Sequence, residues 1–125
     1  MQRAKILLIE DDPGTGAAVQ KVLSTEGFEV ELVRRGEEGL QRANASRYDL
    51  VITDFKLPGI SGLDLIKQLH QSASKLPIIM MTAHGSTETA IEATKLGAYE
   101  YLTKPFEADE LLDLVTDALR NSELM

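Results

Sequence analysis

The chain has 125 residues, a net charge of −7 and no cysteine, so we expect one domain over residues 1–125, without a disulfide framework. Its hydrophobic share of 43% is ordinary for a globular protein, and no apolar run approaches the roughly 20 residues of a membrane span. The acidic balance argues against direct binding of nucleic acid by this segment, and the lack of cysteine suits the cytoplasm.

Apolar strands alternate with amphipathic helices five times along the chain. The expected strands are residues 5–9, 29–33, 49–53, 78–82 and 98–102. The expected helices are residues 13–26, residues 36–45, a helix with Leu63, Ile66 and Leu69 on its inner face, residues 86–96 and residues 107–120. This alternation predicts parallel strands joined by right-handed crossovers, with helices on both faces of the sheet.

Local signals support these assignments. Asp12 can cap the first helix, Pro13 suits its first turn, and Gly27 ends it. Residues 78–82 are apolar throughout, which is typical of a strand buried on both faces, whereas residues 29–33 alternate charged with apolar side chains, as an edge strand does.

The helix expected at residues 86–96 differs from the others in its inner face. That face is predicted to consist of Ala90, Ile91, Ala93 and Thr94. Small side chains bury little apolar surface, so we expect this helix to pack weakly.

Acidic side chains follow the first and third expected strands. Glu10, Asp11 and Asp12 come after the first, and Asp54 comes after the third. Because ligands bind outside the carboxyl ends of parallel strands, these carboxylates should meet at one edge of the sheet. Clustered carboxylates need a positive partner, and Mg²⁺ prefers oxygen ligands. The alternative is that Asp12 only caps a helix, while Glu10 and Asp11 form a solvated turn.

Two further strand ends bring polar groups to the same edge. Lys104 precedes Pro105, which fixes the backbone, and a lysine here can neutralise a phosphoryl group, although most surface lysines are simply solvated. Thr82 ends the fourth expected strand, and the small Ala83 leaves a backbone N–H accessible. Tyr101 is either an ordinary core or edge aromatic, or a side chain that swings between buried and exposed states.

Assembled, these residues resemble the receiver domain of two-component response regulators. The motifs that carry the resemblance are residues 9–12, 53–62, 81–84 and 101–106, which are highly specific together and in this order. The resemblance covers essentially the whole chain. It implies a flavodoxin-like (βα)5 fold of the α/β class, a doubly wound sandwich around a five-stranded parallel sheet in the order 2-1-3-4-5.

The resemblance also implies an activity. A sensor histidine kinase would donate a phosphoryl group to Asp54, which becomes an acyl phosphate. Asp12 and Asp54, with the main-chain carbonyl of Lys56, would hold Mg²⁺ (Mn²⁺ is a possible substitute), and Asp11 would assist through water. The chain would catalyse only its own phosphorylation and dephosphorylation, so we do not expect an enzyme in the ordinary sense.

In the same resemblance, Lys104 and the Thr82 hydroxyl would contact the phosphoryl oxygens, helped by the backbone N–H groups of Phe55 and Ala83. Phosphorylation would draw Thr82 toward the site and let Tyr101 turn inward. The face formed by the last strand and the last two helices would then be remodelled.

Residues 81–106 look most like receivers of the nitrogen-regulator class, which precede an AAA+ ATPase that activates sigma-54 polymerase and a DNA-binding domain. We therefore expect the N-terminal part of a longer cytoplasmic regulator, and a stand-alone receiver is equally allowed. Lys56 and His84 occupy variable positions that would influence the lifetime of the acyl phosphate, although His84 is as simply read as an exposed loop histidine. Leu112 and Leu114 widen the apolar arc of the last helix, which permits a homodimer through the last two helices.

Rival readings explain less of the sequence. A flavodoxin needs a Ser/Thr/Gly-rich phosphate cradle where this chain has acidic residues 10–12, and a haloacid-dehalogenase-type phosphatase needs an acid where it has Lys56. A P-loop nucleotidase is excluded because its glycine-lysine motif is missing. An interaction domain, including a degenerate receiver that is never phosphorylated, leaves the convergence of carboxylates, threonine and lysine unexplained.

Overall fold

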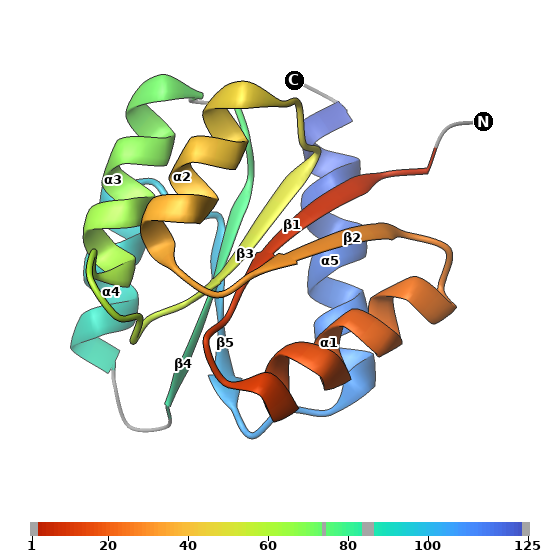
Figure 1. Cartoon of the computed structure of the whole chain (residues 1–125). Helices are drawn as coiled ribbons and strands as arrows, with labels where there is room; N and C mark the ends of the chain where they lie inside the picture. Colours follow the sequence, from red (N-terminus) through yellow and green to blue (C-terminus); the bar gives the residue numbers. More distant parts are fainter. Residues whose placement is uncertain (1–2, 74, 84–86, 124–125) are drawn as a thin grey trace.

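The computed structural model describes residues 3–73, 75–83 and 87–123. Strands and helices alternate regularly along these residues (Figure 1). The strands are β1 (Lys5–Ile9), β2 (Glu29–Val33), β3 (Leu50–Asp54), β4 (Ile78–Ala83) and β5 (Glu100–Lys104). The helices are α1 (Pro13–Thr25), α2 (Gly36–Ala45), α3 (Gly62–Ser72), α4 (Thr87–Leu96) and α5 (Ala108–Glu123).

The strands form one parallel sheet in the order β2-β1-β3-β4-β5. This order confirms the fold predicted from the sequence, including β2 as an edge strand. The chain reverses its direction of travel across the sheet after β2, so β1 and β3 become neighbours. Their carboxyl ends therefore lie next to each other at the position where α/β sheets bind ligands.

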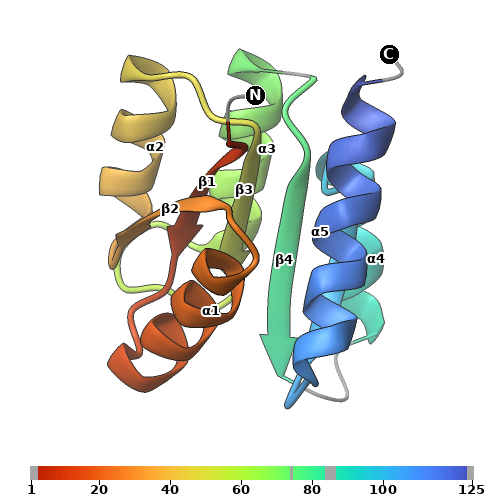
Figure 2. The ribbon, with the colours of Figure 1, turned by 90° about the vertical axis from the view of Figure 1, so that its right-hand side faces the viewer.

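Helices α1 and α5 cover one face of the sheet (Figure 2). Their apolar side chains pack on alternate residues of the strands, as the two-residue period of a strand requires. The buried core on this face consists of Ile6, Leu8, Val19, Leu23, Leu50, Ile52, Ile79, Met81, Leu102, Leu111, Val115 and Ala118. This core fixes α5 close to the strands that carry the candidate site.

Helices α2, α3 and α4 cover the other face (Figure 1). The buried core there consists of Leu7, Ile9, Val33, Tyr48, Val51, Leu65, Ile66, Leu69, Ile78, Met80, Ala93 and Ala98. Both faces of the central strands are thus covered, which explains why residues 78–82 are apolar without interruption.

The inner faces of α3 and α4 differ in part from the sequence prediction. In α3, Leu65 is fully buried beside Ile66 and Leu69, whereas Leu63 is only partly buried. In α4, Ile91 and Thr94 were expected to face inward, and this was wrong, because the Ile91 side chain is 52% exposed and Thr94 is exposed as well. Apolar residues lie on both sides of this short helix, and among its described side chains only those of the small Ala90 and Ala93 are buried.

The fifth strand begins two residues later than the sequence suggested. The Ala98 N–H donates to the carbonyl of Ala93 at 2.9 Å and so belongs to the end of α4. The strand then runs through Lys104, which pairs with Ala83 of β4. Lys104 is therefore held by the sheet ladder, followed by a cis peptide bond to Pro105.

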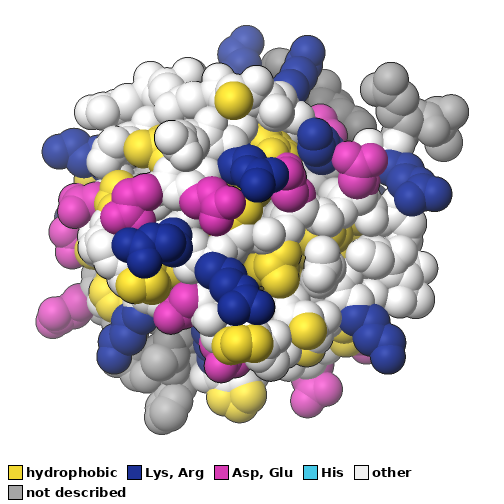
Figure 3. Space-filling view, in the orientation of Figure 1, with side chains coloured by type: hydrophobic (Ala, Val, Ile, Leu, Met, Phe, Trp, Pro, Cys, Tyr) yellow, Lys and Arg dark blue, Asp and Glu magenta, His cyan; other side chains and the backbone are white. Residues whose placement is uncertain are grey.

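Basic and acidic side chains are interspersed over the face seen in Figure 3. None of the helices in the described part of the chain combines the length and the apolar composition that a membrane span needs.

Candidate functional site

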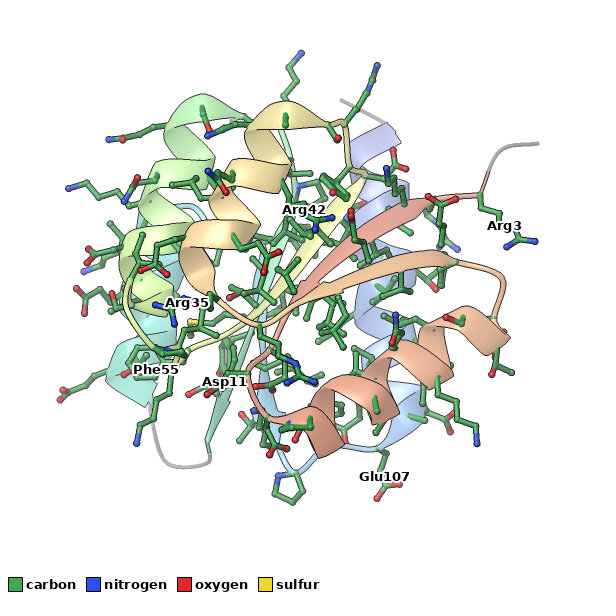
Figure 4. All side chains as sticks on the ribbon, in the orientation of Figure 1. Arg3, Asp11, Arg35, Arg42, Phe55 and Glu107 are labelled. Atoms are coloured by element: carbon green, nitrogen blue, oxygen red, sulfur yellow. The ribbon has the colours of Figure 1, made fainter. Side chains whose placement is uncertain are left out.

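The candidate site lies at the carboxyl edge of the sheet, where three strands end. Glu10 follows β1, Asp54 is the last residue of β3, and Lys104 is the last residue of β5. The register aligns Ile9 with Thr53, which brings the residues after them together. Figure 4 labels Asp11 and Phe55, which follow β1 and β3 at this same edge.

Lys104 joins two carboxylates in this site. Its Nζ lies 2.9 Å from Glu10 Oε1 and 3.0 Å from Asp54 Oδ1. The Glu10 side chain is fully buried and the Asp54 side chain is 12% exposed, whereas the lysine is 27% exposed. The positive charge of Lys104 compensates the negative charge of the two buried carboxylates, because buried charges are stable only when they are paired.

The surroundings shift the pKa values of this group in directions that have clear causes. Burial raises the pKa of Glu10, and the negative charge of Asp54 adds to that effect against the hydrogen bond from Lys104. Burial alone would lower the pKa of Lys104, but its hydrogen bonds to Glu10 and Asp54 outweigh burial and raise that pKa. The lysine therefore stays charged at neutral pH.

The carboxylates of Glu10, Asp11 and Asp54 form a group in which one oxygen from each residue lies within 4.8 Å of the other two. These are the hard oxygen donors that Mg²⁺ prefers, and Asp11 is exposed, so solvent and a phosphate can share the coordination. The donor set therefore fits a magnesium ion.

Asp12 is outside that group, and its predicted role as a direct metal ligand stays a prediction. Its Oδ2 accepts hydrogen bonds from the Thr15 N–H at 2.8 Å and the Thr15 hydroxyl at 2.7 Å. The Thr15 hydroxyl and backbone N–H together lower the pKa of Asp12. The residue caps α1, which was the alternative reading of this position.

Glu10 is the site residue that sequence reasoning missed, because it was treated only as part of an acidic turn. The alternation of β1 contains the signal. Leu8 faces the α1 and α5 side, so the alternation carried two residues further places Glu10 on that side. A carboxylate buried at the end of a strand requires a cation, and Lys104 supplies it.

The other predicted residues are distributed around this centre. Thr82 lies near the end of β4, beside Thr103 in the ladder, and is 2% exposed. The Phe55 N–H donates to Asp54 Oδ1 at 3.0 Å and to the Met81 carbonyl at 2.8 Å. Ala83 pairs with Lys104.

Two of the remaining predicted residues are exposed. Lys56 directly follows Phe55 and has an exposed side chain. The group of Lys56 that is predicted to bind the metal is its main-chain carbonyl, and not this side chain. Tyr101 is 40% exposed, which is the outward orientation of the two states considered for it. His84 lies outside the described residues.

The description "Response regulator receiver domain" belongs to the family model that matches residues 6–116 of this chain. The chain belongs to the response regulator receiver family. The match includes the ends of all strands that form the site. Membership of this family therefore accounts both for the fold and for the position of the acidic centre.

Relatives of this receiver include longer regulators. The transcriptional regulatory protein DltR of Streptococcus agalactiae is 38% identical over 97% of this chain and 54% of its own length. The C4-dicarboxylate transport transcriptional regulatory protein DctD of Pseudomonas aeruginosa is 36% identical over 98% of this chain and 27% of its own length. The crystal structure of NtrX from Brucella abortus superposes with a TM-score of 0.93, at 34% identity, over 98% of this chain and 28% of that protein. The receiver therefore spans between about a quarter and a half of these proteins.

Proposed function

We propose that this receiver is a phospho-accepting switch in which Asp54 takes a phosphoryl group from a phosphohistidine of a sensor kinase. An Asp54 oxygen forms a bond to phosphorus while the bond from phosphorus to the histidine nitrogen breaks, and the imidazole leaves with the electron pair. The observation that carries the proposal is the contact of Lys104 Nζ with both Asp54 and the buried Glu10. A positive charge is already in place where phosphoryl charge would accumulate, and positioned charge is what phosphoryl transfer requires.

The acyl phosphate would be held by groups that the fold brings to this edge. Lys104 and the Thr82 hydroxyl would contact phosphoryl oxygens, and the backbone N–H groups of Phe55 and Ala83 would add further donors. Phe55 N–H already donates to Asp54 Oδ1, so it is aimed at the reacting carboxylate. The self-phosphorylation and later hydrolysis would be the only reactions catalysed.

A magnesium ion, or manganese in its place, would neutralise negative charge on the carboxylates and on the incoming phosphoryl group. We assign its protein ligands to Asp11, Asp54 and the main-chain carbonyl of Lys56. Glu10 lies beside them and pairs with Lys104. The support is the grouping of the Glu10, Asp11 and Asp54 carboxylates, and the two capping hydrogen bonds that engage Oδ2 of Asp12. Substitution of Asp11 by asparagine should therefore weaken Mg²⁺ binding more than the same substitution of Asp12, as measured by titration of backbone amide resonances. Equal losses would restore Asp12 as a ligand.

The output is proposed by analogy with the longer relatives. A receiver joined to an AAA+ ATPase and a DNA-binding domain would control sigma-54-dependent transcription in the cytoplasm, and the resemblance of residues 81–106 to the nitrogen-regulator class supports this. Phosphorylation would move Thr82 and turn Tyr101 inward, changing the face formed by α4, β5 and α5. That face would act on the output domain, or on a second copy of the receiver.

The first experiment measures intact mass after incubation with acetyl phosphate and Mg²⁺. A gain of one phosphoryl group is expected for the wild-type chain and not for Asp54→Asn or in EDTA. If no gain is seen, beryllofluoride is added, because it mimics a phosphoryl group on a carboxylate without forming a labile acyl phosphate. Binding of beryllofluoride would indicate a short-lived acyl phosphate, and failure of both would favour an interaction domain that is not phosphorylated.

A further inference from the structure

The loop between β3 and α3, residues 55–61, carries two backbone groups of the proposed site, the Phe55 N–H and the Lys56 carbonyl. Its two ends are tightly held. The Gly62 N–H donates to the Phe55 carbonyl at 3.0 Å, and a Cβ at Gly62 would lie only 2.7 Å from that oxygen. Ser61 caps α3 by accepting a hydrogen bond from the Asp64 N–H at 3.2 Å. These contacts fix where the loop starts and ends.

The apex of the loop is held from a different element, the first turn of α2. Glu37 Oε2 accepts a hydrogen bond from the Ile60 N–H at 3.2 Å. Gly59 has a φ of +83°, and any side chain there would collide with the Glu37 carboxylate. The carboxylate therefore lies directly against the turn formed by Pro58 and Gly59.

Apolar contacts bring the same two segments together. Leu57 and Ile60 pack against the buried core under α2 and α3. Gly36, the first residue of α2, leaves room for the Ile60 side chain, which would collide with a Cβ at that position. Arg35, which precedes α2, has its Nε 3.9 Å from the Glu37 carboxylate (Figure 4 labels Arg35 and Phe55 at this edge). The start of α2 is thus shaped to receive the loop.

We propose that Glu37 is a positioning residue for the metal and phosphoryl site. Its carboxylate anchors the apex of the loop to α2 and thereby keeps the Lys56 carbonyl in its binding position. Glu37 touches neither the metal nor the reacting atoms, so it acts only through the loop. This inference rests on the proposed function.

The contact depends on an acceptor oxygen more than on charge. The Glu37 side chain is 53% exposed, so its charge is largely screened, whereas the Ile60 N–H needs an acceptor. Glutamine keeps an oxygen at the same distance from the backbone and should restore the contact. Alanine removes it.

Glu38 offers a matched control in the same turn of α2. Its carboxylate pairs with Arg42 at 3.4 Å, and that pair lies on α2 itself. Substituting alanine at residue 38 removes the same charge from the same helix start without changing the acceptor for Ile60.

The test compares wild-type protein with Glu37→Ala, Glu37→Gln and Glu38→Ala. Hydrogen exchange of the Ile60 amide without Mg²⁺ reports the anchor alone. Titration of backbone amide resonances with Mg²⁺ gives the dissociation constant. We expect faster exchange and a dissociation constant raised about three- to tenfold for Glu37→Ala, the size expected from losing one hydrogen bond that orders the loop. Glu37→Gln and Glu38→Ala should resemble the wild type.

Urea unfolding of every variant is measured as well, so that a loss of Mg²⁺ affinity can be separated from a loss of stability. Unchanged Mg²⁺ affinity in Glu37→Ala, with the wild type binding normally, would overturn the positioning role and leave the proposed function intact. An equal loss in Glu38→Ala would show that general charge, and not the loop anchor, is responsible. If the wild-type chain neither binds Mg²⁺ nor accepts a phosphoryl group, the proposed function fails instead.

Discussion

Helices α3 and α4 cover the same face of the sheet and are held there very differently. In α3, Leu65, Ile66 and Leu69 are fully buried. In α4, Ala90 and Ala93 are the buried apolar residues among those described, and Ile91 is 52% exposed. Apolar burial stabilises in proportion to area, so α3 contributes far more to holding its position than α4 does.

Because of this difference, the fold can change at lower free energy around α4 than around α3. Moving α3 would expose large aliphatic side chains next to the strand that carries Asp54, whereas moving α4 would expose mainly alanine. Elements with few buried apolar contacts are those that open most readily. If Asp54 is phosphorylated as proposed, the resulting conformational change would therefore move α4 while α3 stays in place.

The largest effect is expected for Ile66→Ala in α3. The substitution leaves a cavity in a fully buried position and should lower the free energy of unfolding by about 2–5 kcal/mol. Urea unfolding followed by circular dichroism measures it. A loss below about 1 kcal/mol would mean that α3 packs as loosely as α4.

Helix α2 covers the same face as α3 and α4, but polar contacts help to attach it there. Glu31 of β2 accepts hydrogen bonds from Arg42 of α2 and from the hydroxyl of Tyr48, which is 7% exposed. Tyr48→Phe should cost about 1 kcal/mol, the typical net value of one hydrogen bond. Tyr99→Phe is the matched control, since the Tyr99 hydroxyl accepts from Asn121 on the surface and its removal should change little.

The cost of Tyr48→Phe should also depend on pH. The Tyr48 hydroxyl lowers the pKa of Glu31 below its usual 4.5, so this contribution is present above that value and is lost as the pH falls through the lower folded pKa. Burial, with the bond to Glu31, raises the pKa of Tyr48 from 10.0 to about 12, so the contribution also fades as the pH rises through about 12. The difference between wild type and variant should be greatest from about pH 5 to pH 10. A difference that is constant with pH would exclude this hydrogen bond as its source.

The smallest effect is expected for Ile91→Ala in α4. Because more than half of this side chain is exposed, its truncation should change the free energy of unfolding by no more than about 0.5 kcal/mol. Urea unfolding measured beside Ile66→Ala gives the direct contrast between the two helices. A loss of about 1.5 kcal/mol or more would show that α4 is held through Ile91 and would remove the difference described above.

Much of the fold could be predicted because the local signals agreed with each other. Asp12, Pro13 and Gly27 marked the start and end of α1, and the unbroken apolar run of β4 indicated a central strand. The start of β5 was predicted wrongly, because the same sequence signal is compatible with a strand and with the end of a helix. Ala98 has an apolar side chain suited to a strand, but its N–H completes the last turn of α4, and this bond is not visible in the sequence.

The candidate site was predictable in its location and less so in its pairings. The order of the strands places Asp54 and Lys104 at one edge, so their meeting follows from topology. Whether Asp11 or Asp12 joins the cluster depends on which side chain is used by the helix cap, and that is decided by Thr15. The contact of Glu37 with Ile60 depends on the path of a loop, for which the sequence offers no periodicity.

The ion pair between Glu10 and Lys104 joins residues 94 positions apart in the chain. During synthesis, Glu10 and Asp54 are made long before the cation that balances them, and β5 is the last strand of the sheet to be synthesised. A chain that stops short of Lys104 would carry its acidic residues without their lysine. If Asp54 is phosphorylated as proposed, competence to accept a phosphoryl group would consequently appear only after the whole receiver has been made and folded.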